Sequence, residues 1–180
     1  MRVITGKARG VQLKTPEGML TRPTADRVKE ALFSIINFDL PGAAVLDLFG
    51  GTGQLGIEAL SRGAKSAVFV DAREDACRLI RENLKRTKLE SQGKAVRSDY
   101  LDYLKRTREK FDIILLDPPY AEVFLENALK CITEIDILQS GGIIVAERPV
   151  EKELPFEFEG YTRSRDYKYG KTLLTIYRKD

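Results

Sequence analysis

Apolar and polar residues follow one another along this chain in a pattern that predicts strands separated by helices. Short apolar runs, each typical of a buried strand, occupy residues 44–49, 66–71, 94–99, 111–117 and 141–148. Apolar residues at helical spacing follow the first four runs, in segments that end near Gly63, Leu89, Arg106 and Ile135. Strands separated by helices of this length predict a mostly parallel sheet with helices on both faces.

The two ends of the chain depart from this alternation. Residues 1–20 predict short strands and turns, and "RPTADRVKEALFSII" (residues 22–36) predicts a helix that Thr24 is placed to cap. From Phe156 onward the pattern predicts two strands joined near Gly170, an antiparallel hairpin at the edge of the sheet. We therefore predict an α/β fold with a seven-stranded sheet, divided into a basic extension with a helix (residues 1–40), which packs on the rest, and a main domain (residues 41–180).

The composition is that of an ordinary globular protein, with 43% hydrophobic and 32% charged residues among 180. The sequence has no apolar stretch of about 18 residues, which argues against a membrane span, and no signal-peptide pattern at its start, so we expect a cytoplasmic protein. Cys77 and Cys131 lie in helix-like sequence without metal-ligand spacing, and we expect buried thiols. The lack of histidine excludes histidine-based metal sites, catalytic triads and imidazole bases, and we expect no metal.

Positive charge is concentrated at the amino-terminal end, although the net charge of the whole chain is only +3. Residues 1–30 contain seven basic and three acidic residues, whereas the remaining 150 contain 23 basic and 24 acidic residues. Such a segment is typical of proteins that contact a polyanion, but solvated lysines and arginines on an ordinary surface give the same pattern. The charge distribution alone leaves both interpretations open.

A glycine-rich loop in "VLDLFGGTGQLG" joins the first predicted strand to the helix after it. In open α/β sheets ligands bind beyond the carboxyl ends of the strands, where glycines let the backbone approach a ligand closely. The loop has no Walker sequence, but Gly51–Gly56 matches the GxGxxG pattern of dinucleotide-binding proteins. Asp47, at the end of the strand, would repel a pyrophosphate, so the loop favours a ligand that carries positive charge or hydroxyl groups.

Acidic residues end three successive predicted strands, at Asp47, Asp71 and Asp99. Because the carboxyl ends of parallel strands meet at one edge of the sheet, we expect these side chains to lie along that edge. A carboxylate after the second strand can accept hydrogen bonds from both ribose hydroxyls, and one after the third can accept from an adenine amine. A single acid here is more typical of a helix cap or a solvated turn. Three acids beside a glycine loop predict S-adenosylmethionine, which has a ribose, an adenine and a cationic sulfonium but no phosphate.

A fourth acid follows the next predicted strand, in "FDIILLDPPY" (residues 111–120). An Asp-Pro turn at the end of a strand is common, but two consecutive prolines also fix the backbone and remove its N–H donors. The carboxylate of Asp117 and the carbonyl of Pro118 are therefore predicted to form a rigid pair of acceptors for an amine, and Tyr120 offers a ring on which a base can stack. Neither cysteine lies beside a proline, which argues against cytosine C5 methylation through a covalent intermediate.

These motifs resemble those of class I methyltransferases, in which [D/N/S]-P-P-[Y/F] marks enzymes that methylate amine nitrogens of adenine or guanine. Together with "MRVITGKARGVQL" and "TRPTADRVKEALFSII", they resemble the RsmD family over essentially the whole chain, and "RPTADRVKE" is the most specific part. RsmD enzymes are bacterial and methylate the N2 amine of a guanine in 16S ribosomal RNA. The resemblance implies a Rossmann-like class I methyltransferase fold, with residues 41–180 as the domain that uses S-adenosylmethionine.

The resemblance also implies three groups of site residues. The cofactor group is Asp47, Phe49, Gly50, Gly51, Gly53, Asp71, Ala72, Asp99 and Tyr100, and the catalytic loop is Asp117, Pro118, Pro119 and Tyr120. The group expected to contact RNA is Lys7, Arg9, Arg22, Thr24 and Arg27, with the basic tail "RSRDYKYGK" as a weaker candidate. The expected partner is 16S ribosomal RNA within a small-subunit assembly, bound by a monomeric enzyme. A target base in such a pocket must lie in a loop or be flipped out of its helix.

The sequence leaves three alternative functions to be tested. An adenine-N6 methyltransferase acting on DNA or RNA shares the glycine loop and "DPPY", although the 60 residues after Tyr120 leave no room for a separate target-recognition region. An RNA-binding module without catalysis would not need the intact Asp117. A nicotinamide dehydrogenase would match GxGxxG but not Asp47.

Overall fold

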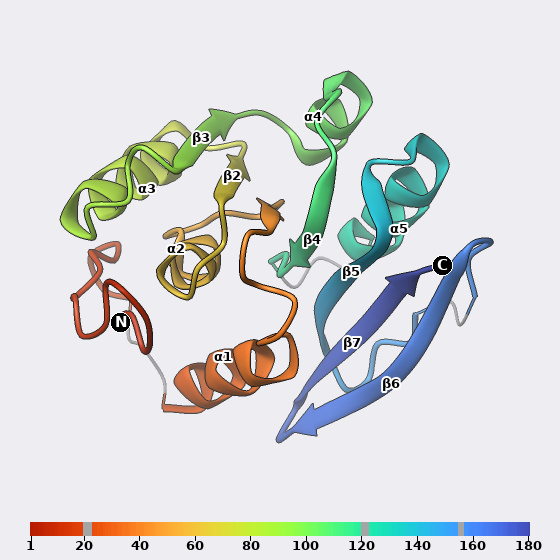
Figure 1. Ribbon diagram of the computed structural model, residues 1–180. Coiled ribbons are helices and arrows are strands. Elements are labelled where there is room, and N and C mark those ends of the chain that lie inside the picture. The colour runs from red at the N-terminus through yellow and green to blue at the C-terminus, as the bar shows by residue number, and fades with distance from the viewer. Residues whose placement is uncertain (20–22, 120–122, 155–156) are drawn as a thin grey trace.

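The computed structural model describes residues 1–19, 23–119, 123–154 and 157–180, with only the backbone described at 23 and 24. In this part of the chain seven strands form one sheet in the order β3-β2-β1-β4-β5-β7-β6 (Figure 1). Strands β1 to β5 pair in parallel, and β7 lies antiparallel between β5 and β6. The strands are β1 (Ala44–Asp47), β2 (Ser66–Asp71), β3 (Gly93–Arg97), β4 (Phe111–Leu116), β5 (Leu138–Pro149), β6 (Tyr161–Tyr169) and β7 (Thr172–Lys179).

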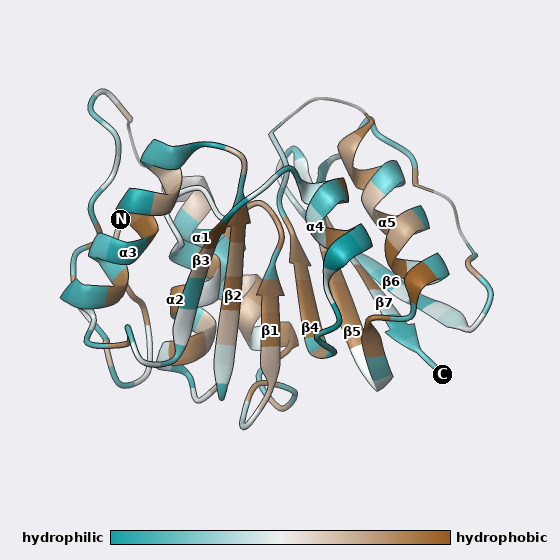
Figure 2. Ribbon diagram, turned by 90° about the horizontal axis from the view of Figure 1, so that it is seen from above, coloured by the Kyte–Doolittle hydropathy of each residue, from teal (hydrophilic) through white to brown (hydrophobic). Residues whose placement is uncertain are grey.

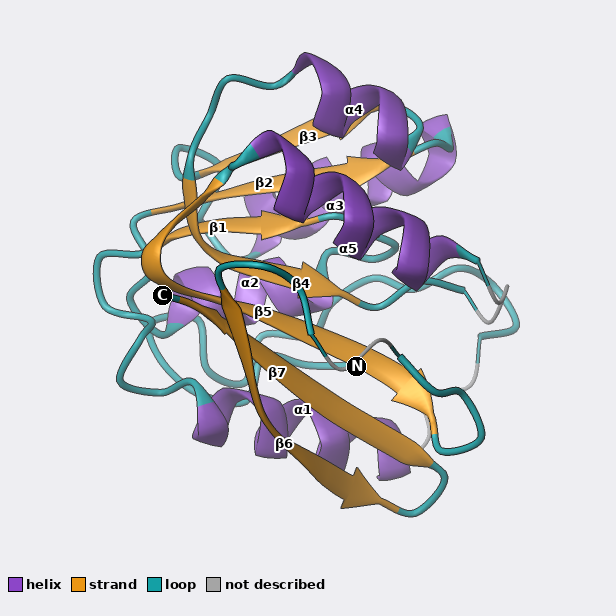
Figure 3. Cartoon of the chain, turned by 90° about the vertical axis from the view of Figure 1, so that its right-hand side faces the viewer, coloured by secondary structure: helices purple, strands orange, loops and turns teal. Residues whose placement is uncertain are grey.

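Helices cover both faces of the sheet, which confirms the predicted α/β architecture with its carboxyl-terminal hairpin. Buried side chains of α1 (Pro23–Ile35), α2 (Gln54–Ser61) and α3 (Glu74–Arg86) form a core with one face. Those of α4 (Tyr100–Arg106) and α5 (Phe124–Ile135) form a second core with the other face. Figure 2 shows the hydrophobic central strands between helices with hydrophilic outer sides, and Figure 3 shows the sheet lying between α1 and the α4–α5 pair. No helix of the described residues is long and apolar enough to cross a bilayer.

The strand order reverses between β1 and β4, because the chain leaves β1 towards β2 and returns on the other side at β4. At such a reversal the connections diverge above the two strands and leave a crevice beyond their carboxyl ends. This crevice lies beside the loop that follows β1 and the loop that follows β4. The fold therefore brings the predicted glycine loop and the "DPP" sequence to one place.

The amino-terminal segment differs from its prediction in two respects. Residues 1–19 form turns and a single antiparallel bridge between Arg2 and Gln12, so the prediction of short strands is wrong for this described part. Helix α1 begins at Pro23, so Thr24 lies inside its first turn and not at the predicted capping position. A proline is favourable at the first position of a helix, because the N–H that it lacks has no partner there in any case.

Glu58, on α2, anchors the amino-terminal segment to the rest of the protein. Its carboxylate oxygens accept hydrogen bonds from the backbone N–H groups of Ile4 at 2.9 Å and Thr5 at 3.0 Å. The same carboxylate pairs with Arg62 at 3.0 Å and with Lys29 of α1 at 3.7 Å. Glu58 is fully buried, and a buried charge is stable only when it is paired and hydrogen-bonded. This one side chain therefore ties the amino-terminal segment, α1 and α2 together.

Lys29 is buried and is therefore not part of a solvated basic surface, although the sequence analysis counted it in the basic segment. Its Nζ donates to the backbone carbonyl of Arg2 at 2.8 Å, and burial lowers its pKa although Glu58 acts to raise it. Lys14 is also paired, with Glu82 of α3 at 2.7 Å. Of the seven basic residues within 1–30, Lys29 is thus paired inside the protein and Lys14 is paired at the surface, so less unpaired positive charge faces solvent than the sequence indicated.

Asn83, on α3, links the amino-terminal segment to the glycine loop. Its Nδ2 donates to the carbonyls of Thr52 at 2.9 Å and Lys14 at 3.0 Å, while its Oδ1 accepts from the Lys14 N–H at 2.7 Å. The side chain is fully buried, so these bonds are shielded from competing water. The loop that follows β1 is thereby held by a helix that belongs to the next strand-helix unit.

We expect Glu58→Ala to lower the free energy of unfolding by about 3–5 kcal/mol, because it leaves Lys29 buried without its carboxylate. Urea denaturation followed by circular dichroism measures this loss. Glu82→Ala is the matched control: it removes an acid whose ion pair with Lys14 is solvent-exposed, and it should change stability little. Equal effects of the two substitutions would contradict the anchoring role of Glu58.

Candidate active site

The strand register brings four acids to the same edge of the sheet and to the same face. Asp47 pairs with Phe69 of β2 and with Leu115 of β4, so Asp71 and Asp117 each lie two residues beyond it. The residues just before Asp47, Asp71 and Asp117 pack in the core of α4 and α5. Because successive side chains of a strand alternate between faces, the acids themselves project towards the side of α1, α2 and α3. Glu147 of β5, which follows Ala146 of the same core, does the same.

Asp47 is the most deeply buried of these acids, at 1% exposure. Its Oδ2 accepts a hydrogen bond from the backbone N–H of Gly56 at 3.1 Å, whereas its Oδ1 is buried and has no hydrogen-bond partner among the described residues. Burial, and to a lesser degree the charges of Asp117 and Asp71, raise the pKa of Asp47 to about 8. An unsatisfied buried carboxyl oxygen lowers the stability of the free protein. A ligand that donates a hydrogen bond or carries positive charge would relieve this cost, so Asp47 favours the binding of such a ligand.

Asp71 and Asp99 are engaged with the backbone in different ways. Asp71 accepts from the Gly51 N–H through Oδ2 and from the Arg73 N–H through Oδ1, both at 3.0 Å. Asp99 caps α4, since its Oδ1 accepts from the N–H groups of Leu101 at 2.9 Å and Asp102 at 3.2 Å. Each carboxylate oxygen has a second lone pair. Both acids therefore keep acceptor capacity for a ligand while they fix the loops around it.

Two glycines of the literal GxGxxG match have structural reasons to be glycine. Gly53 precedes α2 with φ of +82°, a left-handed conformation that other residues adopt at a cost. A Cβ at Gly56 would lie 2.3 Å from the ring of Phe69, so only glycine lets α2 pack this closely on β2. The Gly56 N–H binds the Asp47 carboxylate and not a phosphate. The match therefore reflects helix packing and does not indicate a dinucleotide.

A cavity of about 790 Å³ lies above the carboxyl ends of the strands and is bounded by the predicted cofactor residues. Its lining includes Asp47, Phe49, Gly50, Gly51, Asp71, Ala72, Asp99, Tyr100 and Asp117. The rings of Phe49, Tyr100 and Phe124 contact one another with centroids 5.2 to 6.1 Å apart and form an aromatic side of this cavity. Gly53 lies behind this lining, against Ile57 and Ile80. A cavity with an aromatic side, several acids and the unsatisfied Asp47 oxygen fits S-adenosylmethionine, which combines a base, hydroxyls and a cation.

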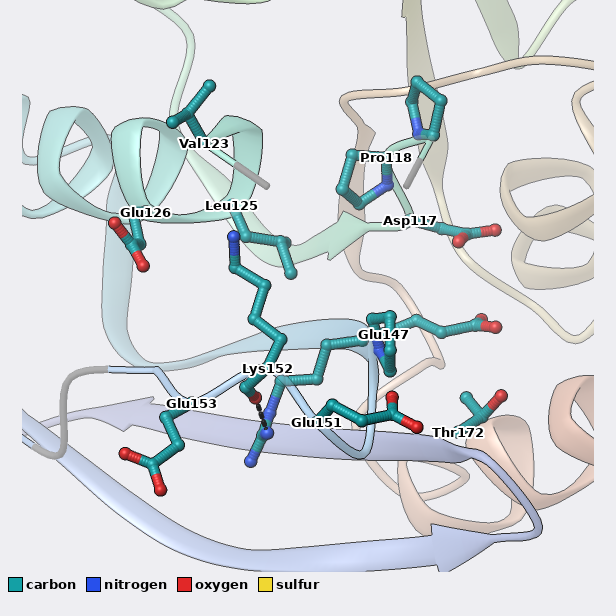
Figure 4. A pocket seen from close by; sticks show the side chains of 13 residues that line it. Asp117, Pro118, Val123, Leu125, Glu126, Glu147, Glu151, Lys152, Glu153 and Thr172 are labelled. Carbon is teal, nitrogen blue, oxygen red and sulfur yellow. Dashed lines mark hydrogen bonds between the residues drawn. The ribbon is translucent and has the colours of Figure 1, made fainter. Parts of the chain in front are cut away.

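A second cavity, of about 560 Å³, lies on the other side of the residues that follow β4. Asp117, Pro118, Pro119 and Glu147 line both cavities and so form the wall between them. Figure 4 shows this second cavity, with the Asp117 and Glu147 side chains extended in the same direction. Burial raises the pKa of Asp117 to about 6. The described residues of the predicted catalytic loop therefore lie between the two cavities, while Tyr120 lies outside the described residues.

Glu147 is a site residue that the sequence analysis missed. It is half-buried, and burial, followed by the negative charge of Asp117, raises its pKa to about 8. The strand continues to Pro149, so Glu147 is not at an apparent strand end as the other acids are. The register would have revealed it: Leu116 pairs with Ala146, which places Asp117 beside Glu147. Phe124, at the start of α5, was missed because the sequence gives no sign that it approaches Phe49 and Tyr100.

The structure separates the residues predicted to contact RNA. Lys7 and Arg9 are exposed, but the Lys7 backbone N–H binds the carbonyl of Ser61 at the far end of α2 from the glycine loop. Arg27 is exposed on α1, whose residue Ala25 lines the cofactor cavity. Arg22 and the side chain of Thr24 lie outside the described residues. Arg27 thus lies on a helix that borders the site.

The two ends of the basic tail "RSRDYKYGK" (residues 163–171) lie in different surroundings. The turn between β6 and β7 lies beside the second cavity, because Thr172 pairs with Pro149 and both line it. Lys168 and Lys171 flank this turn. Arg163, by contrast, pairs with Asp166 inside a network that includes the buried Arg148. Only the turn end of the tail is placed to contact a substrate at the site.

Comparison with known proteins shows similarity along the whole chain. The family described as conserved hypothetical protein 95 matches residues 1–178. YlbH of Bacillus subtilis is 41% identical over 182 residues, which cover 99% of this chain and 99% of that protein. Ribosomal RNA small subunit methyltransferase D of Haemophilus influenzae is 34% identical over 157 residues, covering 86% of this chain and 81% of that protein. The solved structure of YhhF from Escherichia coli has a TM-score of 0.91 and 28% identity, covering 100% of this chain and 98% of that chain.

We expect Asp47→Asn to stabilise the free protein and to weaken its binding of S-adenosylmethionine. The pKa of Asp47 is about 8 in the folded chain against 3.8 for an ordinary aspartate, so the folded state loses stability as the pH rises between these values. An asparagine keeps an acceptor for Gly56 without the buried charge, and should raise the free energy of unfolding at pH 7 by about 0.5–2 kcal/mol. Loss of the charge should weaken cofactor binding by about 30-fold or more.

Urea denaturation and titration calorimetry measure the two effects. Asp102→Asn is the matched control, because Asp102 is exposed on α4 and lines neither cavity. Normal cofactor binding by Asp47→Asn would show that this carboxylate does not serve the cofactor.

Proposed function

The chain belongs to the conserved hypothetical protein 95 family, and on this premise we propose that it transfers a methyl group from S-adenosylmethionine to the N2 amine of a guanine in 16S ribosomal RNA. Methyl transfer to ribosomal RNA is supported by the name of the relative from Haemophilus influenzae. The observation that carries the proposal is the position of Asp117 on the wall between a cofactor-sized cavity and a second cavity.

The cofactor cavity has a residue for each part of S-adenosylmethionine. Asp71, at the end of β2, accepts from the ribose hydroxyls, and Asp99, after β3, accepts from the adenine amine. Phe49 and Tyr100 pack against the adenine ring, while Asp47 offers its unsatisfied oxygen and its charge to the cationic end. When bound, the cofactor supplies an activated methyl group on a positively charged sulfur.

The catalytic loop holds and activates the amine. An exocyclic amine of a base is a weak nucleophile, because its lone pair is delocalised into the ring. The Asp117 carboxylate and the Pro118 carbonyl accept the two N–H groups, which favours a pyramidal nitrogen and stabilises the positive charge that develops on it. One of these N–H bonds then breaks, and its proton goes to Asp117 or to water. Two prolines keep this loop rigid, so that the acceptors need little rearrangement during the reaction. Tyr120 stacks on the base in this proposal.

The RNA reaches the second cavity as a flipped or unpaired nucleotide. Arg27 contacts a phosphate beside the cofactor cavity, and Lys168 and Lys171 contact phosphates beside the second cavity. Arg22 and Thr24 contact RNA phosphates as well in this proposal. Lys7 and Arg9 are anchored further away and serve a more distant part of the RNA. The partner in this proposal is 16S ribosomal RNA within a small-subunit assembly, and the enzyme acts as a monomer.

We expect Asp117→Asn to lower the rate of methyl transfer by about 10²–10³-fold, because asparagine replaces a charged acceptor where positive charge develops. The assay follows transfer of labelled methyl groups from S-adenosylmethionine to 16S ribosomal RNA or small-subunit particles, and mass spectrometry identifies the methylated nucleoside. Cofactor affinity should stay within a few-fold, with Asp102→Asn again as the control. Methyl transfer to adenine in RNA or duplex DNA, with none to guanine, would contradict the proposed substrate, and full activity of Asp117→Asn would contradict the proposed catalytic role.

A further inference from the structure

The wall between the two cavities carries a second acid for which the proposed chemistry has no role so far. Leu116 and Ala146 pair in the parallel ladder of β4 and β5, so Asp117 and Glu147 occupy adjacent positions on neighbouring strands. Adjacent strands lie about 4.8 Å apart, which is within the span of one base edge. Both side chains project from the same face of the sheet and extend in the same direction in Figure 4.

Glu147 has no hydrogen-bond or ion-pair partner within residues 1–19, 23–119, 123–154 and 157–180, although its side chain is half-buried. The nearby Arg148 turns away from this wall and binds Asp166 at 2.8 Å and Thr175 at 2.9 Å. A carboxyl group that is partly desolvated, unpaired and next to a second acid costs stability unless a ligand supplies donors.

The two purines that carry exocyclic amines differ at the atom beside the amine. In guanine the N2 amine is flanked by N1–H, so the edge offers adjacent donors. In adenine the N6 amine is flanked by N1 with a lone pair, so the edge offers a donor beside an acceptor. Two adjacent ionised carboxylates offer hydrogen-bond acceptors and no donor. They therefore match the guanine edge and are unfavourable for the adenine edge, where the N1 lone pair would face a second acceptor.

We propose that Glu147 accepts the N1–H of the target guanine while Asp117 holds the N2 amine, and that Glu147 thereby selects guanine over adenine. This inference rests on the proposed function, since it assigns the specificity of the same site. A site built to bind an N–H discriminates strongly against a base that lacks it, because its buried acceptor is then left unpaired. Glu147 acts here as a specificity-determining residue, and Asp117 remains the group that touches the reacting nitrogen.

This role requires Glu147 to be ionised when the base is bound. In the free protein its pKa of about 8 keeps the carboxyl mostly protonated at neutral pH. A positive charge in the cofactor cavity and an N–H donor in the second cavity both favour the ionised form. The acceptor pair is therefore complete when both ligands are in place.

The test compares the rates of methyl transfer to two RNA substrates, one with guanine and one with 2-aminopurine at the target position. That position is the nucleotide that mass spectrometry of the methylated RNA identifies. 2-Aminopurine keeps the N2 amine but has a lone pair at N1 in place of N1–H. The native protein should methylate the guanine substrate with a kcat/KM about 10²-fold or more above that for 2-aminopurine. Glu147→Gln offers both a donor and an acceptor through its amide, so it should raise kcat/KM for 2-aminopurine and narrow this ratio by at least about tenfold.

A second variant and a control keep the result unambiguous. Glu147→Ala removes the acceptor for N1–H of guanine and also the repulsion between the carboxylate and the N1 lone pair of 2-aminopurine. It should lower the guanine to 2-aminopurine ratio of kcat/KM mainly through loss of activity on guanine. Glu134→Gln, an exposed change on α5, should leave the ratio as it is in the native protein. Equal use of guanine and 2-aminopurine by the native protein, or an equal loss on both substrates in the Glu147 variants, would overturn the role of Glu147 and leave the proposed function intact. No methyl transfer to guanine by the native protein would overturn the proposed function and this inference together.

Discussion

The site depends on one constraint: several carboxyl groups are buried close together at one edge of a parallel sheet, where they repel one another. Asp47, Asp117 and Glu147 come from different strands, yet parallel pairing makes their positions coincide to within two residues. Burial raises the pKa of each, to about 8, 6 and 8 respectively. Folding alone does not compensate for this crowding, so the edge gains most from a ligand with positive charge and N–H donors. In the proposed function, a sulfonium cofactor on one side of the wall and a base amine on the other provide both.

The amino-terminal segment stabilises the loop at this edge of the sheet through two buried side chains. Glu58 fastens the segment to α1 and α2, and Asn83 joins it to the carbonyl of Thr52 in the glycine loop. Each link is a buried polar group with partners from elements far apart in the sequence, so the loop is fixed by the fold as a whole. The stability that the acidic edge lacks is thus offset by well-satisfied polar groups on the side of the sheet where α1, α2 and α3 pack.

The sequence predicted what depends on local pattern and missed what depends on pairing between strands. The strands and helices followed from apolar spacing, and Asp47, Asp71, Asp99 and Asp117 were selected as candidates because each lies at or just after the end of an apolar run. Glu147 was missed because β5 continues past it to pair with β7, and only the register with β4 shows which residue it faces. Lys29 was counted as surface charge because a lysine on a helix gives no sign that Glu58 of another helix will bury it. Short strands predicted for residues 1–20 did not form in the described part, where one bridge with a few backbone hydrogen bonds is fastened to α2 by side-chain anchors.

The release of protons on cofactor binding tests the acidic edge most directly. Titration calorimetry at pH 7 in two buffers with different heats of ionisation gives the number of protons exchanged as the ligand binds. Because Asp47 and Glu147 have pKa values near 8 in the free protein, a bound cation should ionise them and release protons, more for S-adenosylmethionine than for S-adenosylhomocysteine, which lacks the charged sulfur. Binding of both ligands with no proton exchange would show that the carboxyl groups at this edge do not hold the cation.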